Sequence, residues 1–251
     1  MQAFCEGHDS ARKHATVTFV LALVVLLLSS SAARADRRSY VWTYEYQTKP
    51  PGGVELEHYM TAKTGDLDAK SMTSWEHRVE LEIGLTDRWD FSIYQIFNQP
   101  PGGAFHYDSF QLRTRYRLGE AGQWFADPLL YFEYRRPQNL TSPNKAEGKL
   151  ILARDFQKVN VAVNLIEEVK FAPGSEWETA YTAGVSVEPN PVLKLGAEAF
   201  GQLVTDEDEA HYLGPTISLA REGWFYSVGL GFGLNDHADD LQARAILGVD
   251  L

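Results

Sequence analysis

Hydrophobic and polar residues alternate along most of the chain, most regularly between Ser74 and Phe97. In the first half of this stretch, one face carries Trp75, His77, Val79, Leu81, Ile83 and Leu85, and the other carries Glu76, Arg78, Glu80, Glu82 and Gly84. This period of two predicts a β-strand with two unlike faces. An apolar face and a charged face, with tryptophan near the strand ends, are typical of a hairpin in a transmembrane β-barrel.

The same alternation recurs in further segments up to Leu251, where tight turns mostly alternate with longer polar loops. It predicts an all-β fold, an antiparallel transmembrane β-barrel of about 12 strands. An even number of strands would return both ends of the barrel to the periplasmic side. The predicted strands are 54–63, 73–85, 88–98, 107–118, 128–137, 147–157, 159–171, 176–188, 191–203, 210–220, 222–234 and 240–251.

Charged residues gather on the polar faces of the early strands. Unpaired charges are costly in a low-dielectric interior, so we expect these side chains to pair across strands or to contact water. Two interpretations stay open: a charged wall along a solute pathway, or a salt-bridged core that fills a small barrel. The residues are Glu55, Glu57, Glu76, Arg78, Glu80, Glu82, Asp90, Arg113, Arg115, Arg117, Glu133 and Arg135.

The polar faces of the later strands carry much smaller side chains, and we call this side the light half of the barrel. They carry Gly196, Gly214, Ser218, Gly229, Gly231 and Gly233. Small residues would leave space beside the charged half of the barrel. Glycine in a strand also marks bends and places where another backbone or a ligand approaches closely. The sequence leaves both interpretations open.

The chain begins with the pattern of an export signal. A basic start, an apolar run over residues 17–28 and a small-residue site before Asp36 predict a cleaved signal peptide over residues 1–35. The apolar run is too short to span a membrane as a helix. The single cysteine, Cys5, lies in this signal, so we expect no disulfide and no lipid-anchor cysteine in the mature chain. The expected location is the cell outer membrane.

Residues 36–53 precede the regular alternation and form a separate N-terminal segment, followed by the barrel at residues 54–251. The segment is rich in aromatic residues and ends at Pro50-Pro51-Gly52-Gly53. We expect a short extended periplasmic segment that tucks under or into the barrel. The alternative is one further strand.

The formal net charge of −11 argues against nucleic acid as a partner, because such a partner needs a basic surface. Two acidic loops could in principle bind a metal ion through carboxylate and imidazole groups. Their weak candidate ligands are Asp206, Asp208, His211, Asp236 and His237. No ligand spacing matches a known metal loop, and no nucleophile, base and orienting group come together. The sequence therefore predicts no metal, no cofactor and no enzymatic activity.

The segment Gly84-Leu85-Thr86-Asp87-Arg88-Trp89 resembles the inner-turn hairpins of Gram-negative outer-membrane β-barrel proteins. The run from Lys49 to Glu57 resembles the entry into the first strand in one poorly characterised group of these proteins, with porin-like transport implied. The resemblance implies outer-membrane lipid and the outer-membrane assembly machinery as partners. One departure is the last residue, Leu251, where such barrels usually end in an aromatic residue.

The sequence thus favours an outer-membrane barrel with a narrow charged channel for small solutes. The first alternative is a closed structural or adhesive barrel that acts through its acidic outer loops. The second is a soluble periplasmic barrel that binds an apolar ligand, which would require the charged faces to lie outside. Against the second stands the large apolar patch that the aliphatic faces would expose to water.

Overall fold

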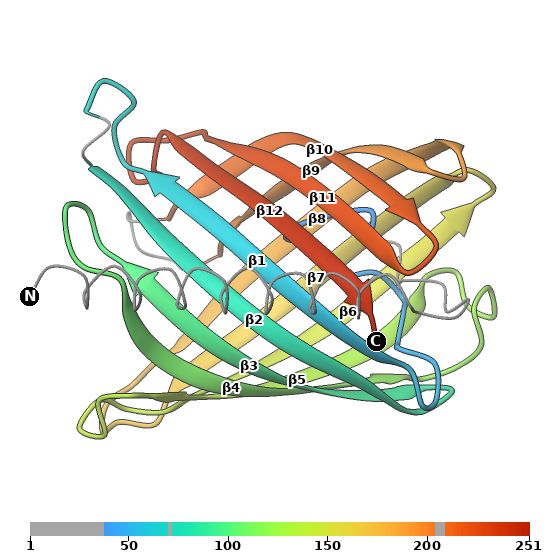
Figure 1. Cartoon of the computed structure of the whole chain (residues 1–251), viewed down its shortest axis with the longest axis horizontal. Coiled ribbons are helices and arrows are strands. Elements are labelled where there is room, and N and C mark those ends of the chain that lie inside the picture. Colours follow the sequence, from blue (N-terminus) through green and yellow to red (C-terminus); the bar gives the residue numbers. More distant parts are fainter. Residues whose placement is uncertain (1–37, 70–71, 204–208) are drawn as a thin grey trace, which may run out of the picture.

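The computed structural model describes residues 38–69, 72–203 and 209–251, so the predicted signal peptide lies outside the described residues. Twelve strands form one closed barrel (Figure 1). They are β1 (Val54–Thr64), β2 (Thr73–Thr86), β3 (Trp89–Gln99), β4 (His106–Arg117), β5 (Asp127–Pro137), β6 (Lys145–Phe156), β7 (Val159–Lys170), β8 (Trp177–Asn190), β9 (Leu193–Gln202), β10 (His211–Arg221), β11 (Trp224–Gly233) and β12 (Leu241–Asp250). No helix among the described residues is long and apolar enough to cross a membrane.

The predicted fold class and strand order are confirmed. Each strand pairs antiparallel with its neighbours in the sequence, and β1 closes the barrel by pairing with β12 from Glu55 opposite Asp250 to Thr64 opposite Leu241. The predicted and observed strand ends differ by at most two residues. Because β1 starts and β12 ends at the same rim, the first and last strands meet where the tight turns lie.

The two faces of each strand have different surroundings. In β1, Leu56 is 39% exposed on the outside, whereas its neighbour Glu57 is 1% exposed inside the barrel. The other strands repeat this pattern, with aliphatic and aromatic side chains outside and charged or small ones inside. The soluble alternative required the charged faces to lie outside and is therefore wrong. In a bilayer the apolar exterior lies against lipid, where it carries no exposure cost.

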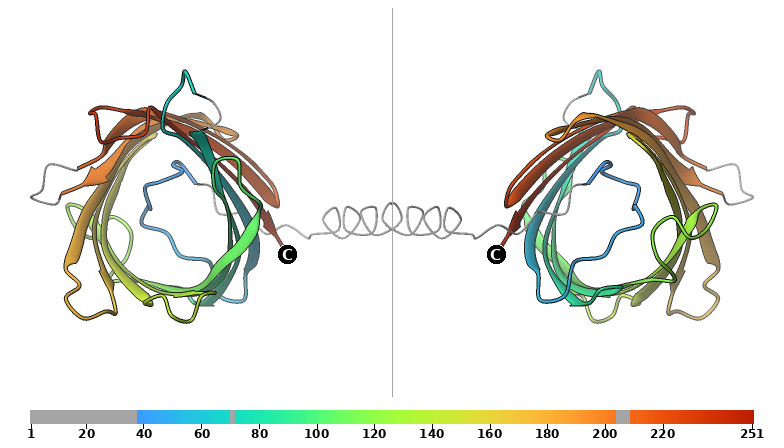
Figure 2. Two further views of the ribbon diagram at one scale, coloured as in Figure 1. Left: turned by 90° about the vertical axis from the view of Figure 1, so that its left-hand side faces the viewer. Right: turned by 90° about the vertical axis from the view of Figure 1, so that its right-hand side faces the viewer.

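The N-terminal segment lies inside the barrel. Figure 2 shows it in blue, crossing the opening enclosed by the strands. The described part, residues 38–53, contains no strand, so the alternative of one further strand is wrong for these residues. The aromatic residues Tyr40 and Trp42 are buried. In the lumen, both rings pack against other buried hydrophobic side chains.

A tight turn links the segment to β1. Gly52 has a φ of 76°, and the amide of Gly53 donates to the carbonyl oxygen of Pro50 at 2.9 Å. The turn is held against β2, because Gly52 and Gly53 exchange hydrogen bonds with Gly84. A Cβ atom at position 84 would lie 1.9 Å from the carbonyl oxygen of Pro50. Glycine is therefore required there for the chain to turn back into the lumen.

Candidate functional site

Arg113 lies at the centre of a buried ion-pair cluster on β2, β3 and β4. Its Nη2 atom is 2.9 Å from carboxylate oxygens of both Glu80 and Glu82. The guanidinium also donates to Tyr94 Oη at 2.8 Å and to Ser92 Oγ at 2.6 Å. The side chain is 1% exposed. Such burial is tolerated because each charge meets an opposite charge and further hydrogen bonds.

Arg115 extends the cluster towards the rim of the tight turns. It donates from Nη2 to Asp90 Oδ2 at 2.6 Å, and the same nitrogen contacts the carboxylate of Glu82. Asp90 also accepts the backbone amide of Lys49 at 3.1 Å. Asp90 therefore connects the ion-pair cluster of the barrel wall to the backbone of the N-terminal segment.

The N-terminal segment supplies two cations to carboxylates of the wall. Lys49 Nζ lies 2.6 Å from Glu55 and 2.5 Å from Asp250, which joins the first and last strands. Arg38 Nη2 lies 3.0 Å from Glu57 and contacts the hydroxyl of Tyr59. Burial lowers the pKa of Arg38, but Glu57 and the other acidic groups around the guanidinium together raise the pKa well above its ordinary value.

The remaining members of the predicted set lie elsewhere in the lumen, and all of them except the buried Glu133 are partly exposed. Glu76 and Arg78 form an ion pair at 2.7 Å. The sequence left open whether the charged residues line a pathway or fill the barrel. The cluster around Arg113 and the pair of Glu76 with Arg78 differ in their access to water. The cluster around Arg113 is packed, whereas this pair is reachable by water. In the same set, Arg117 donates to the carbonyl of Asp87, Glu133 accepts from the hydroxyl of Tyr131, and Arg135 pairs with Asp108.

The light half of the lumen is filled by the N-terminal segment and by aromatic residues. A Cβ atom at Gly229 would lie 2.4 Å from Val41 Cγ2, and one at Gly184 would lie 2.5 Å from the ring of Tyr40. A Cβ atom at Gly231 would lie 2.6 Å from the ring of Phe200. At these positions glycine marks a close approach, so the interpretation of empty space beside the charged half is wrong there.

Glu198 of β9 holds the N-terminal segment by its backbone. The carboxylate accepts the amides of three consecutive residues, Val41, Trp42 and Thr43, at 2.8 to 2.9 Å. It also accepts the hydroxyl of Thr216 at 2.6 Å and is 1% exposed. No cation forms an ion pair with it within the described part of the chain. Backbone amides therefore stabilise this buried charge.

Asn164 of β7 makes a second backbone attachment. Its side-chain oxygen accepts the amide of Tyr44 at 2.7 Å, and its nitrogen donates to the carbonyl of Tyr44 at 2.9 Å. Sequence analysis did not single out Asn164 or Glu198. Both are polar residues on otherwise light inward faces, and that contrast was the available signal.

Aromatic rings of the segment and of the wall stack on one another inside the lumen. Trp42 stacks on Phe200 at a centroid distance of 4.4 Å, and Phe200 stacks on Tyr212 at 4.8 Å. On the other side, Tyr44 lies among cations, with the charged groups of Arg113 and Lys149 at 5.9 and 5.0 Å from its ring centroid. The segment therefore contacts both halves of the lumen wall.

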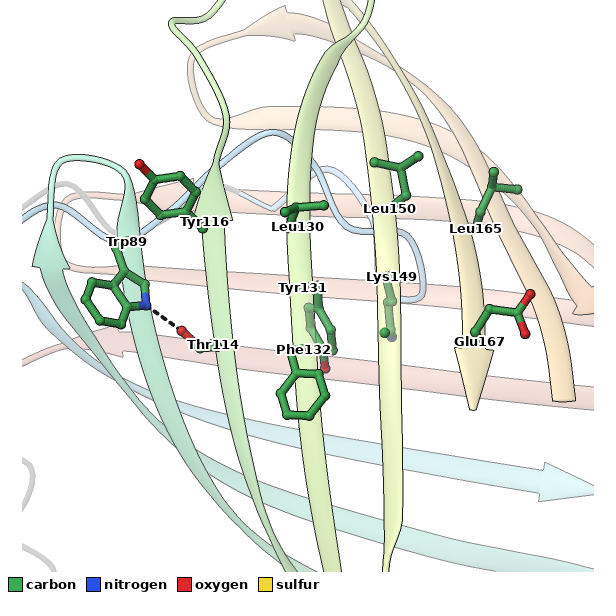
Figure 3. A pocket seen from close by; sticks show the side chains of 11 residues that line it. Trp89, Thr114, Tyr116, Leu130, Tyr131, Phe132, Lys149, Leu150, Leu165 and Glu167 are labelled. Atoms are coloured by element: carbon green, nitrogen blue, oxygen red, sulfur yellow. Dashed lines mark hydrogen bonds between the residues drawn. The ribbon is translucent and has the colours of Figure 1, made fainter. Parts of the chain in front are cut away.

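A shallow apolar groove of about 740 Å³ crosses the outer face of β3 to β7 (Figure 3). Trp89 and Tyr116 lie at one end, and Trp89 donates to Thr114 Oγ1 at 2.5 Å. Gly148 leaves the groove open, since a Cβ atom there would meet nothing within 4 Å. The groove therefore lies on the outer, apolar face of the barrel.

The predicted metal candidates are only partly described. Asp206 and Asp208 lie outside the described residues. His211 contacts Tyr181 Oη at 3.2 Å and Glu209 at 3.4 Å. Among the described residues, carboxylates close enough to share an ion occur instead at Glu55, Glu57 and Glu82. Cations of the chain already pair with these three groups.

The architecture is that of the outer-membrane β-barrel proteins. Three solved structures share it: an outer-membrane channel from Pseudomonas putida F1 (12% identity, covering 84% of this chain and 100% of that one, TM-score 0.58), the KdgM porin (12%, 78% and 97%, 0.56) and the NanC porin (11%, 78% and 98%, 0.54). Comparisons with models of protein families and with curated proteins find no match. At these identities the likeness shows the fold alone.

Proposed function

We propose that the protein is an outer-membrane channel for small hydrophilic solutes, with residues 38–49 as a movable plug. The attachment of this segment carries the proposal: the segment adds no strand to the barrel, and side chains of the wall hold its backbone. Such a segment can leave the lumen without breaking any hydrogen bond between strands. The KdgM porin, which shares the fold, has been solved in complex with disordered oligogalacturonate.

Polar surface on both sides of the plug supports a solute path. On the outer side, partly exposed ion pairs line the lumen, among them Lys145 with Glu168 and Lys149 with Glu147. On the periplasmic side, a polar cavity of about 270 Å³ lies beside Glu45 of the segment. Removal of the segment would join these two regions. A channel of this kind needs no catalytic residue.

Glu198 is the contact to remove first. Glu198→Gln keeps the shape of the side chain but replaces a charged acceptor of three amides by a neutral amide group, which weakens these hydrogen bonds. We expect single-channel recordings in planar bilayers to show more frequent or longer openings for this variant than for the unaltered mature chain. Glu178→Gln is the matched control, because Glu178 pairs with Lys170 at the exposed outer rim of the barrel, away from the segment.

A disulfide provides the opposite test. Val41→Cys with Gly229→Cys is the pair to cross-link, because Val41→Cys replaces the methyl group that a Cβ atom at position 229 would meet at 2.4 Å, and the edge of the Trp42 ring, at 2.8 Å, would have to shift. The predicted mature chain has no other cysteine. We expect the oxidised protein to be silent and the reduced protein to conduct. If Glu198→Gln and the reduced double-cysteine variant both fold, insert and remain silent, the channel proposal fails. The closed structural or adhesive barrel would then be favoured.

A further inference from the structure

The barrel wall places acidic residues directly opposite one another at its periplasmic end, where β1 lies between β2 and β12. The register pairs Glu55 with Asp250 on one side and with Glu82 on the other. It also pairs Glu57 with Glu80. All five side chains occupy inward positions and are at most 2% exposed. Like charges directly opposite one another in antiparallel strands are destabilising, so these carboxylates need cations beside them.

Two arginines of the barrel serve one side of this acidic group. Arg113 lies 2.9 Å from both Glu80 and Glu82. Arg115 forms ion pairs with Glu82 and Asp90. With Asp90 included, the group has six buried carboxylates, and the described part of the barrel contributes two cations to its ion pairs. The N-terminal segment provides two further cations, one on each side of β1.

Lys49 of the segment occupies an ammonium site between β1 and β12. Its Nζ atom lies 2.6 Å from Glu55 and 2.5 Å from Asp250, and all three side chains are buried. The second carboxylate oxygen of Asp250, Oδ2, is also buried and accepts no hydrogen bond from a described residue. An ammonium group has three donors. The two carboxylates therefore fit such a group and have acceptor capacity beyond what Lys49 uses.

Arg38 occupies a second cation site, two residues further along β1. Its guanidinium donates from Nε and Nη2 to the two carboxylate oxygens of Glu57, at 3.2 and 3.0 Å. It also lies 5.4 Å from the ring centroid of Tyr59. A carboxylate that accepts two hydrogen bonds and the face of an aromatic ring both favour a bound cation. Glu57 and Tyr59 belong to the barrel wall, so they stay in place when the segment leaves.

Acidic and basic groups are more evenly matched elsewhere in the described lumen. In the outer part, cations of the barrel form ion pairs with carboxylates of the barrel: Arg78 with Glu76, Arg135 with Asp108, Lys145 with Glu168 and Lys149 with Glu147. The periplasmic cavity of about 270 Å³ is bordered, besides Glu45 of the segment, by three carboxylates and two cations of the barrel: Asp127, Asp155, Glu188, Arg154 and Lys194. The excess of acidic groups therefore lies in the periplasmic half of the lumen.

We propose that the carboxylates of Glu55, Glu57 and Asp250 bind the ammonium or guanidinium groups of a cationic solute in the open channel. Lys49 and Arg38 hold these places while the segment closes the lumen. The two sites lie about 7 Å apart along β1, which suits a solute with two cationic groups. They rest on the movable plug of the proposed function and deepen that function by naming the class of solute.

Isothermal titration calorimetry of the folded mature barrel in detergent at low salt tests these sites with putrescine, a diamine. A tethered cation competes with a free one at an effective concentration of about millimolar for a short linker. Arg38→Ala with Lys49→Ala removes both competitors, so we expect this variant to bind putrescine at least about tenfold more tightly than the unaltered chain. Butanediol, which carries hydroxyl groups in place of the ammonium groups, should bind neither protein measurably. The control Lys170→Ala removes a cation at the exposed outer rim and should bind putrescine as weakly as the unaltered chain.

Equal affinity of the double variant and the unaltered chain for putrescine, or equal binding of putrescine and butanediol, would overturn the sites. The single variant Lys49→Ala guards against misfolding, because it keeps Arg38 in place and should still bind putrescine more tightly than the unaltered chain. Calorimetry needs no conductance. Binding of putrescine by a barrel that stays silent in planar bilayers would support the sites and refute the channel.

Ion selectivity gives the second measurement. In planar bilayers with a gradient of potassium chloride, we expect the openings of Glu198→Gln to favour potassium over chloride at least about fivefold, because acidic groups concentrate cations in a narrow lumen. Adding Glu57→Gln should reduce this ratio, although it also removes a contact of the segment. Openings that favour chloride would overturn the proposed class of solute and leave the channel standing.

Discussion

The two sides of the lumen wall stabilise their buried charged groups in different ways. The half formed by β1 to β4 carries long charged side chains, and Arg113 reaches Glu80 and Glu82 on a nearby strand. The half formed by β7 to β12 carries mostly small residues, and the buried carboxylate of Glu198 is neutralised by no side chain of the wall. One half satisfies its charges largely by itself, and the other needs the N-terminal segment.

This difference shows where the closure of the lumen is permanent and where it can change. Ion pairs between strands persist for as long as the barrel is folded. Contacts with residues 38–49 persist only while the segment stays inside. In the proposed channel, removal of the segment would uncover the light half, and the ion pairs between strands would keep the charged half as the fixed wall.

Loss of Arg113 should have the largest effect on stability. Arg113→Met leaves the buried carboxylates of Glu80 and Glu82 without their cation, and breaking a buried pair in this way costs about 3–5 kcal/mol. Urea unfolding of the barrel in lipid vesicles, followed by tryptophan fluorescence, measures the free energy of unfolding. A loss below about 1 kcal/mol would mean that the charged half is not the fixed wall described above.

A larger side chain in the light half should have the next largest effect. In Gly229→Val, the new atoms would collide with Val41, so either the core is overpacked by about 1–3 kcal/mol or the segment leaves the lumen. Quenching of Trp42 fluorescence by iodide would distinguish the two results. Gly148→Val is the matched control, because that position opens onto the outer groove and has room for a side chain. The same loss of stability in both variants would contradict the role of the segment.

Removal of a partly exposed lumen pair should have a smaller effect. Lys149 lies 2.9 Å from Glu147 and 4.5 Å from the ring centroid of Tyr131. Water can replace part of this interaction, so Lys149→Met should lower the free energy of unfolding by about 1 kcal/mol in the same urea experiment. A loss as large as that of Arg113→Met would show that the outer half of the lumen is as dry as the buried cluster.

The smallest effect is expected at the exposed outer rim of the barrel. Lys170 pairs with Glu178 at 2.6 Å, but both side chains are well exposed to solvent. Lys170→Ala should therefore change the free energy of unfolding by less than about 0.5 kcal/mol, and less still in high salt. A larger loss would contradict the contrast between buried and exposed ion pairs on which the other comparisons depend.

The alternation of the sequence was sufficient to predict most of the architecture. A strand places successive side chains on opposite faces, so the run from Trp75 to Leu85 already assigned one face to lipid and one to the lumen. Strand number, strand order and the inward position of the charged residues follow from repeating this rule. Arg113 and Glu80 could be predicted as inward residues, but not as direct partners, because the register between strands depends on turns and bulges.

The position of residues 38–49 followed only in part from the sequence, and their contacts did not follow at all. An irregular segment has no period, so nothing along the chain indicated that Tyr40 packs against Gly184 or that Glu198 accepts three amides. Those contacts join residues more than a hundred positions apart and arise only when the barrel closes. Local alternation thus determined the wall of this protein, whereas tertiary structure decided what fills it, because filling depends on the shape of the whole lumen.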